Sequence, residues 1–482
     1  MPLLPINWIN LLKPTEVGDI LAPTVLSMVL GSLADNRIVI TCSEPLDTGS
    51  VPAVGDFALA GISVPIDSIS VQGSTIWVIL KDNVPDNYTL TLSYTAGANP
   101  IQDAAHNNLA NFTTQSVTNS SSDHADVVLS IAFTATQFVF KWKAPAGNDV
   151  TFHEGEGTTQ TVSGADASLR TTTFSHSGAG TYDVWLSGDD ADLTYIDISG
   201  QSFVSGDVSG WSALTKLTVL RCSTTSIEGD VSGWSALTSL TSLNCSATSI
   251  EGDVSGWSAL TSLTSLSCSA TSVTFDATPA WTNASATIRL ESCGLDSTMV
   301  DNSIASLSTC TSCTINISGT NAHRTAASND DLNTLLANGN SVTLNDTLSA
   351  EKITDGAFPD ATNWDVTDAS WAIAAGVSTY DDANDDAGLI QTDGNMASSI
   401  AVDTVYRAAF TTDATPTNAA IAIKNAAEDV VYFAQANYTD GTHVIYFTTP
   451  GAISGGGIAF VAYQAGDAYT LDDVSLKTVT FP

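Results

Sequence analysis

Hydrophobic positions recur with a fixed period in the middle of the chain. Three stretches, 202–225, 226–248 and 249–271, align without gaps in their core, and their tryptophans and cysteines recur every 23 residues. Helices repeat every ~3.6 residues and strands every ~2, so neither gives the spacings of 3, 3, 3, 2, 3 and 2 found along one turn. A coil with one short strand per turn gives these spacings, and each inward side chain then packs against its copy in the next coil. The inward positions of one turn are Trp234, Leu237, Leu240, Leu243, Cys245, Thr248 and Ile250.

Weaker copies of this pattern extend the coils in both directions. They are Ile196-x-Ile198, Ile288-x-Leu290, Ile315-x-Ile317 and, at the far end, Val342-x-Leu344. The sequence therefore predicts a solenoid of about six coils over residues 190–345, whose two ends need caps.

The motif LxxLxxLxC followed by Thr resembles the leucine-rich repeat family, and the IxGDV segment resembles its plant-type LxGxIP variant. Thr225, Thr248 and Cys293 stand where the family has a ladder asparagine. A hydroxyl or thiol satisfies fewer backbone groups of the turn than an amide does.

Residues 21–118 alternate apolar and polar positions in short runs, separated by Gly, Asn and Asp turns. This pattern predicts a β-sandwich. This segment resembles the SwmB-type bacterial Ig-like domain in the sequence ITCSEPLDTGSVPAVGDFAL…YTLTLSYTAGANPIQDAAHNNLANFTTQSVTN. That resemblance implies a spacer and adhesion module without catalysis.

Residues 124–189 resemble a PKD-type sandwich, with His153-Glu-Gly-Glu-Gly157 in place of that family's WGDG. A sandwich directly before the coils can cover the open first coil. His153, Glu154, Glu156 and His176 allow a metal-site interpretation, but a hairpin turn and a strand position explain them better.

Residues 350–482 open with ITDGAFPDATNWDVTDASWAI and end with AYTLDDVSLKTV, which resembles the jelly roll of carbohydrate-binding modules. The resemblance predicts that the opening and closing segments are strands of one sandwich. It also implies a structural calcium ion held by Asp355, Asp472 and Asp473, although Pro359 replaces the family's acidic residue. Sugar binding would need exposed aromatic rings that stack on the sugar. Each candidate for such a ring could instead be a core residue; the candidates are Trp371, Tyr380, Tyr406, Tyr432 and Tyr438. The predicted fold class is thus mainly β and multidomain: Ig-like β-sandwiches, a leucine-rich-repeat solenoid and a C-terminal jelly-roll β-sandwich.

The net charge of the chain argues against two classes of partner, nucleic acid and anionic lipid. The chain carries 51 Asp+Glu against 14 Lys+Arg, a formal net charge of −37. No basic patch can form to release phosphate counterions, which argues against nucleic acid and anionic lipid. The chain has no run of about 18 apolar residues, so the sequence does not predict membrane insertion. The apolar start, Met1 to Leu12, lacks a basic residue and a cleavage site, so we do not expect a secretion signal.

Chemistry-bearing motifs are few. The CxxC of Cys310 and Cys313 has no second ligand pair, which disfavours zinc. The six histidines fall in no HExxH, GxSxG or phosphate-loop motif, and the many paired carboxylates lie in polar loops. The sequence predicts a protein that is not an enzyme and needs no cofactor beyond the structural calcium.

The predicted series of sandwiches, solenoid and jelly roll suggests a structural or adhesive function. The first hypothesis is a structural or adhesion protein of a bacteriophage virion, as a tail fibre, head fibre or decoration protein on the virion surface. Residues 1–20, with Trp8, Ile9, Leu11 and Leu12, would dock on other virion proteins, or would add an edge strand to the first sandwich. Distal modules would meet host surface glycans or proteins, and a homo-oligomer is expected. The alternatives are a bacterial cell-surface or extracellular-filament adhesin exported without a classical signal, and an accessory chain of a secreted polysaccharide-active enzyme.

Overall fold

The computed structural model describes residues 20–481, except 33, 123, 134–136, 155–158, 177, 367–369, 385, 414–418 and 464–467. The predicted docking residues Trp8, Ile9, Leu11 and Leu12 lie outside this range. The protein is mainly β, as predicted, and divides into two compact units. Unit 1 comprises residues 1–194 and 203–214, and unit 2 comprises residues 195–202 and 215–482.

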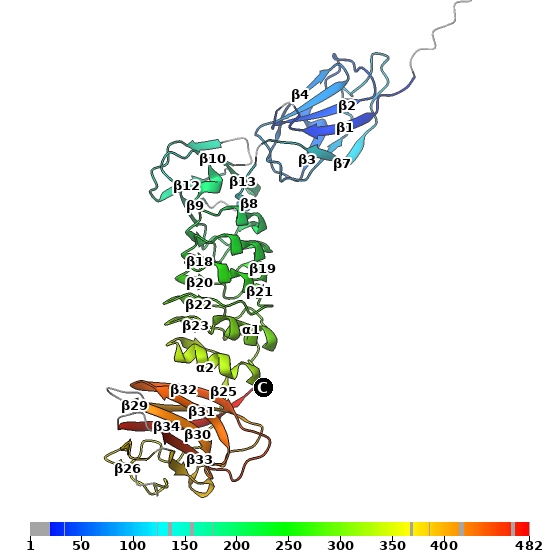
Figure 1. Cartoon of the computed structure of the whole chain (residues 1–482). Helices are drawn as coiled ribbons and strands as arrows, with labels where there is room; N and C mark the ends of the chain where they lie inside the picture. Colours follow the sequence, from blue (N-terminus) through cyan, green and yellow to red (C-terminus); the bar gives the residue numbers. More distant parts are fainter. Residues whose placement is uncertain are drawn as a thin grey trace, which may run out of the picture. The chain divides into compact units, whose positions relative to one another are not determined.

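Unit 1 begins with a sandwich whose sheet runs in the order β3-β6-β7-β1-β2-β5-β4 (Figure 1). Strand β2 buries every second residue, and so do β5 and β6, which confirms the predicted alternation. The elements of this first sandwich are β1 (Val25–Leu30), β2 (Arg37–Cys42), η1 (Val54–Asp56), β3 (Phe57–Ala60), β4 (Ile66–Gln72), β5 (Thr75–Leu80), β6 (Leu90–Tyr94) and β7 (Phe112–Asn119).

The second sandwich of unit 1 places strands β11-β10-β13-β8-β15 side by side and pairs β12 with β9. Its core is aromatic: Phe138 stacks on Phe174 at 5.2 Å between ring centroids. The elements are β8 (Val128–Phe133), β9 (Phe138–Lys143), β10 (Val150–His153), β11 (Thr159–Val162), β12 (Arg170–Phe174), β13 (Gly180–Gly188), η2 (Asp190–Asp192), β15 (Val204–Asp207) and η3 (Ser209–Ala213).

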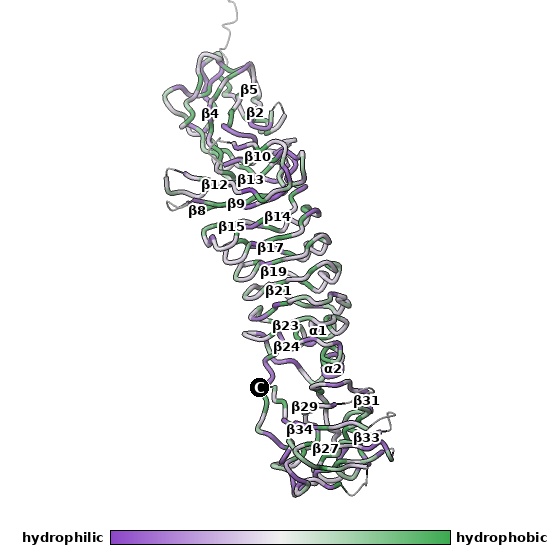
Figure 2. Tube along the Cα trace, turned by 90° about the vertical axis from the view of Figure 1, so that its left-hand side faces the viewer, coloured by the Kyte–Doolittle hydropathy of each residue, from purple (hydrophilic) through white to green (hydrophobic). Residues whose placement is uncertain are grey.

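Unit 2 begins with stacked coils, each adding one strand to a parallel sheet β14-β16-β18-β20-β22-β23-β24, so the predicted solenoid is present (Figure 1). Leu220 pairs with Leu243 and Leu243 with Leu266, one repeat apart. A second row, β17-β19-β21, follows the other side of the turns (Figure 2). The sheet strands are β14 (Tyr195–Asp197), β16 (Val219–Arg221), β18 (Ser242–Asn244), β20 (Ser265–Ser267), β22 (Thr287–Arg289), β23 (Thr314–Asn316) and β24 (Ser341–Thr343). The remaining elements are β17 (Ser226–Asp230), η4 (Ser232–Ala236), β19 (Ser249–Asp253), η5 (Ser255–Ala259), β21 (Ser272–Thr274), α1 (Ser297–Leu307), η6 (Ala326–Ser328) and α2 (Asn329–Ala337).

The predicted inward side chains of the coils from Ile196 to Ile317 are buried, none of them more than 9% exposed, whereas Val342 and Leu344 of the last coil are partly exposed. Trp234 stacks on Trp257 with 6.1 Å between ring centroids and 11° between planes. At the ladder position Thr248 makes one bond, from Oγ1 to the Cys245 carbonyl at 2.7 Å. Asn321 in a later coil makes four, two donated by Nδ2 and two accepted by Oδ1. The threonine coils are therefore held mainly by apolar packing.

Each threonine coil also turns through a residue with left-handed backbone. Ala247 and Ala270 both have φ of +54°. This conformation costs an L-residue about 1–2 kcal/mol, whereas glycine adopts it freely and loses about 0.5–1 kcal/mol of chain entropy. Ala247→Gly should therefore raise the free energy of unfolding by up to about 1 kcal/mol in urea titrations. The control Ala236→Gly, in η4 without positive φ, should lower it, and a destabilising Ala247→Gly would contradict the argument.

The C-terminal jelly roll of unit 2 consists of two sheets, β26-β27-β34-β29-β32 and β28-β33-β30-β31, with β25 paired to β34. The closing segment forms β34, as predicted. Residues 371–373 of the opening segment belong to β26, whereas residues 353–364 form no strand; there Gly356 O accepts from Val474 N of β34 at 2.9 Å. The elements are β25 (Thr347–Leu348), β26 (Trp371–Ala374), β27 (Val377–Tyr380), β28 (Ala387–Gln391), η7 (Asp393–Asn395), β29 (Val405–Asp413), β30 (Ala419–Asn425), β31 (Val431–Tyr438), β32 (Gly441–Thr448), β33 (Ile458–Tyr463) and β34 (Tyr469–Thr480). No helix in the described residues is long and apolar enough to cross a membrane.

Candidate functional site

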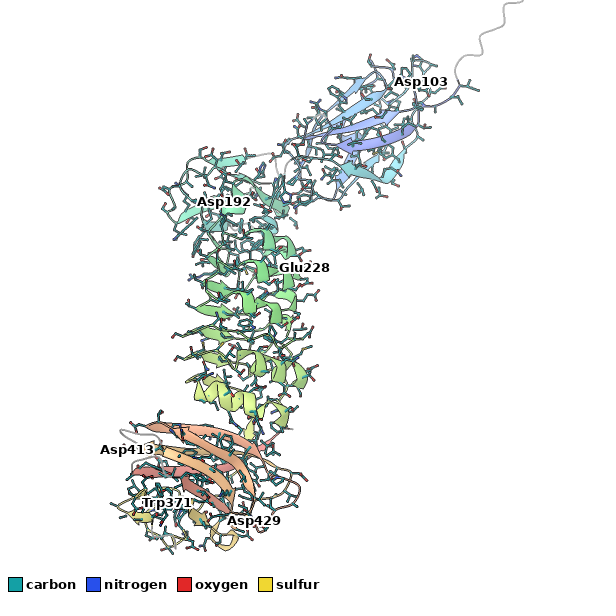
Figure 3. The ribbon with its side chains drawn as sticks, viewed as in Figure 1. Asp103, Asp192, Glu228, Trp371, Asp413 and Asp429 are labelled. Atoms are coloured by element: carbon teal, nitrogen blue, oxygen red, sulfur yellow. The ribbon has the colours of Figure 1, made fainter. Side chains whose placement is uncertain are left out.

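The five aromatic residues expected as a sugar-stacking platform are all buried. Their exposed fractions are 3% for Trp371, 0% for Tyr380 and Tyr406, 7% for Tyr432 and 8% for Tyr438. Trp371 lies among packed side chains inside the sandwich (Figure 3), and its ring centroid is 5.4 Å from that of Tyr380. The prediction of an exposed platform made of these rings is therefore wrong, because both strands that carry Trp371 and Tyr380 turn them into the core.

Tyr432 differs from the other four because it lines a hollow at the end of the solenoid. This junction hollow has a volume of about 290 Å³. Tyr432 stacks on Phe447 at 5.7 Å with 8° between ring planes. Burial raises the pKa of its hydroxyl to about 12, and Oη has no hydrogen-bond partner among the described residues. The residues that line the junction hollow are Ala326, Ala327, Asn329, Asp330, Tyr432, Phe433, Tyr446, Phe447 and Thr448.

Two parts of unit 2 build the walls of the junction hollow. Strands β31 and β32 supply four aromatic side chains, and η6 with the first turn of α2 supplies small and polar ones. Asn329 and Asp330 start α2, where short polar residues suit the free backbone N–H groups. The combination of rings with amide, carboxylate and hydroxyl groups suits a ligand that has both apolar faces and hydroxyl groups.

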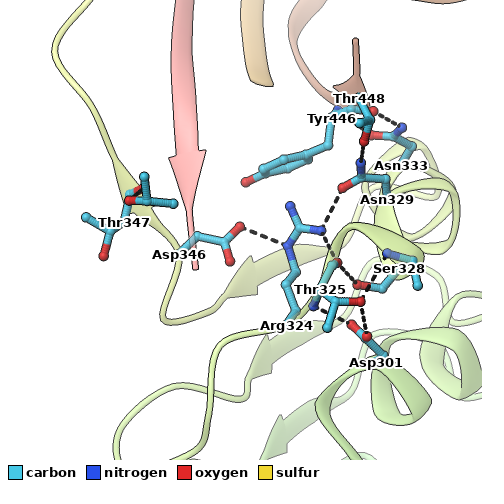
Figure 4. Close-up of polar contacts among 12 residues, drawn as sticks. Asp301, Arg324, Thr325, Ser328, Asn329, Asn333, Asp346, Thr347, Tyr446 and Thr448 are labelled. Atoms are coloured by element: carbon cyan, nitrogen blue, oxygen red, sulfur yellow. Dashed lines mark hydrogen bonds and ion pairs between the residues drawn. The ribbon is translucent and has the colours of Figure 1, made fainter. Parts of the chain in front are cut away.

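A buried ion pair lies beside these walls. Arg324 Nε donates to Asp346 Oδ2 at 2.9 Å, and their side chains are 0% and 8% exposed. Arg324 Nη1 donates to Asn329 Oδ1 at 2.7 Å (Figure 4). The guanidinium also lies over the Tyr446 ring, 4.6 Å from its centroid.

Two asparagines of α2 complete the anchor. Asn333 Nδ2 donates to Tyr446 O at 2.7 Å, and Asn333 Oδ1 accepts from Tyr446 N at 2.6 Å. Asn329 Nδ2 donates to Thr448 Oγ1 at 3.1 Å. Helix α2 is thereby bonded to β32 at two positions, Asn329 and Asn333, which holds the two walls of the hollow together.

A second hollow of about 390 Å³ lies nearby and shares Tyr446. Leucine and valine side chains of the last coil form much of its wall, among them Leu332, Leu336 and Val342. The ring-rich wall of the junction hollow is absent from its lining, so the junction hollow is the better candidate for a carbohydrate.

The structure does not assemble the calcium set implied by the jelly-roll resemblance. The described residues contain no group of three or more His, Cys, Asp or Glu placed to hold a metal ion. Asp355 Oδ2 instead accepts from Asn363 Nδ2, and Asp472 Oδ1 accepts from Asp473 N at 2.7 Å. Asp355 and Asp472 thus accept hydrogen bonds from neighbouring groups, and the expected grouping of Asp355, Asp472 and Asp473 is corrected accordingly.

The histidines of unit 1 have structural partners. His153 Nδ1 bonds to Asp82 Oδ2 at 3.0 Å and Nε2 to Ser187 Oγ at 2.8 Å. This is the connectivity of a hydrolytic triad. Ser187, however, is only 8% exposed and lies inside strand β13. We interpret these three side chains as a polar contact between the two sandwiches. His176 stacks on Tyr182, with 4.0 Å between the ring centroids.

All seven cysteines are free and buried. Burial raises the pKa of Cys310 to about 12, so its thiol stays protonated at neutral pH. The buried CxxC therefore serves packing.

Comparisons with known proteins find short, distant likenesses. No family model matches the chain, and no curated protein matches it. A CBM4 carbohydrate-binding module covers 26% of this chain and 99% of its own, with 15% identity and a TM-score of 0.20. The CBM22-1 xylan-binding domain of Xyn10C from Paenibacillus barcinonensis covers 28% and 96%, with 9% identity and a TM-score of 0.20. An internalin of Listeria monocytogenes covers 31% and 47%, with 20% identity and a TM-score of 0.22.

Sequence reasoning named only one residue of the junction hollow, Tyr432. It missed Phe433, Tyr446, Phe447 and Asn329 because they come from segments more than 100 residues apart in the chain. No short motif marks them.

Proposed function

We propose that this chain is a non-enzymatic recognition and scaffold protein that binds a neutral carbohydrate in the junction hollow. The observation that carries the proposal is the buried, unpartnered hydroxyl of Tyr432 in a wall of aromatic rings. A buried hydroxyl without a partner is costly, and a ligand hydroxyl that bonded to it would remove that cost. The chain's net charge of −37 favours neutral over anionic sugars.

We place this recognition protein on a bacteriophage particle, as a fibre or decoration protein, with a bacterial surface adhesin as the alternative. Support comes from the series of sandwiches and near-identical coils, which suits a spacer that displays a binding module. Cryo-electron microscopy and mass spectrometry of purified particles should find the chain on the virion surface. Its absence from every particle, together with surface labelling of bacterial cells, would favour the alternative.

Glycan binding is tested with the whole chain on a glycan array, followed by calorimetry of the best neutral ligand. Tyr432→Phe keeps the ring and its stack on Phe447 but removes the hydroxyl, and affinity should fall about tenfold, the worth of one good hydrogen bond. Tyr438→Phe is the matched control, since Tyr438 is equally buried, also has an unpartnered Oη, and lies outside the junction hollow. Equal affinities of the two variants would contradict the site, and no binding to any glycan would contradict the function.

A further inference from the structure

A hollow of about 420 Å³ lies in unit 1, within the usual size range of small-molecule sites. We call it the unit 1 hollow. Tyr88 lines it from the first sandwich, Asp126 from the segment that leads into β8, and Asp207 and Trp211 from β15 and η3. Two of these side chains are buried hydrogen-bond donors and two are carboxylates, so polar groups of both kinds meet in one small space.

Trp211 brings the first donor. It is 1% exposed, and its Nε1 has no hydrogen-bond partner among the described residues. In later turns of the solenoid the equivalent nitrogen donates to the preceding turn, as Trp257 Nε1 does to Val231 O at 3.2 Å and Trp281 Nε1 to Ser255 O at 3.3 Å. Trp211 belongs to the first repeat, 202–225, so no earlier repeat supplies this carbonyl. A buried N–H without an acceptor is destabilising, and a ligand acceptor would remove that cost.

Tyr88 brings the second donor. Its Oη has no hydrogen-bond partner among the residues that the structure describes, and its ring packs edge-on to Trp185 with 6.1 Å between ring centroids. Burial, together with the neighbouring Asp183 carboxylate, raises the pKa of the Tyr88 hydroxyl. The hydroxyl therefore keeps its proton at neutral pH and is available as a donor, so the unit 1 hollow presents two donors that need acceptors.

Asp126 and Asp207 bring the acceptors. Asp126 Oδ1 lies 3.2 Å from His124 Nε2, and Asp207 Oδ1 accepts from Ser209 N at 2.9 Å. Both contacts use Oδ1, so Oδ2 of each carboxylate can accept from a ligand. A ligand that fits the hollow therefore has to accept from two groups and donate to two others.

From these contacts we propose that the unit 1 hollow binds a neutral polyol of about the size of a monosaccharide. A hydroxyl group both donates and accepts, so neighbouring hydroxyls of one ligand can accept from Trp211 Nε1 and Tyr88 Oη and donate to the two carboxylates. A simple cation would leave both buried donors without acceptors, and an anion would be repelled by the carboxylates. The site is separate from the junction hollow of unit 2, and either site can fail without the other.

The test is hydrogen exchange of the full chain, followed by mass spectrometry, with myo-inositol, glucose, galactose and mannose as probes. At least one polyol should saturably slow amide exchange in residues 204–213, which include β15 and η3. Cyclohexanol has one hydroxyl on a six-membered ring and cannot bond to all four groups, so it should bind at least about tenfold more weakly. Equal protection by cyclohexanol and the polyols, or no protection of residues 204–213 by any probe, would overturn the proposal. Protection confined to β31 and β32 would also overturn it, while supporting the junction hollow.

Two variants and a matched control locate the site. Tyr88→Phe keeps the ring and removes the hydroxyl, so affinity for the best polyol should fall about tenfold. Gly210→Met should abolish binding, because Gly210 lines the hollow and a Cβ there would meet no atom within 4 Å, which leaves the longer side chain free to fill the space. Gly256→Met makes the same change at the equivalent position of a later repeat, outside the hollow, and should leave affinity unchanged. Equal affinities of the Gly210 and Gly256 variants would overturn the assignment.

Discussion

Replacement of Arg324 by methionine is expected to lower the free energy of unfolding of unit 2 by about 3–5 kcal/mol. The change leaves Asp346, which is 8% exposed, buried without its counter-charge, and an uncompensated buried charge costs that much. Asp346→Leu should cost a similar amount for the same reason, since it strands the fully buried guanidinium. Chemical denaturation followed by circular dichroism, with tyrosine fluorescence for the jelly roll, measures both.

The double variant Arg324→Met/Asp346→Leu should cost less than either single variant, because a buried pair replaced by apolar groups leaves no charge unpaired. Asp166→Asn is the control: in its ion pair with Arg170 the two side chains are 64% and 30% exposed, and exposed pairs are worth at most about 1 kcal/mol. Additive costs of the two single changes in the double variant would show that Arg324 and Asp346 act separately.

The solenoid could be predicted from the sequence because each of its contacts is between equivalent positions of successive coils. A period of 23 residues and one list of inward positions therefore fix most of the packing. Residues that repeat along the sequence therefore occupy equivalent positions in successive coils.

The candidate site could not be predicted in the same way. Strand β30 is buried at every position, Ala419 to Asn425, so no alternation reveals which of its faces points to the core. The five aromatic candidates lie on other strands; the sequence left open whether they were core rings or platform rings, and the structure buries them. The junction hollow depends on α2 meeting β32, and contacts such as Asn333 with Tyr446 span 113 residues without any local signal.

The second large effect is expected from Trp257→Ala in the solenoid. Trp257 is fully buried, stacks on Trp234, and donates to Val231 O. Removing a buried tryptophan costs about 3–5 kcal/mol through lost burial and the cavity that remains. Thr261→Ala, at an exposed position of the same coil, is the control and should change the free energy of unfolding by less than about 0.5 kcal/mol.

The loss caused by Trp257→Ala should also be local. Each coil contacts only its neighbours, so the stability of the stack is a sum of nearest-neighbour interfaces. Hydrogen exchange should show reduced amide protection in β18, β20 and β22, while β29 and β34 of the jelly roll keep theirs. Equal loss of protection in β29 and β34 would mean that solenoid and jelly roll unfold as one cooperative body. In that case the Arg324–Asp346 anchor, with the asparagine bonds of α2, would couple the two parts more strongly than neighbouring coils couple each other.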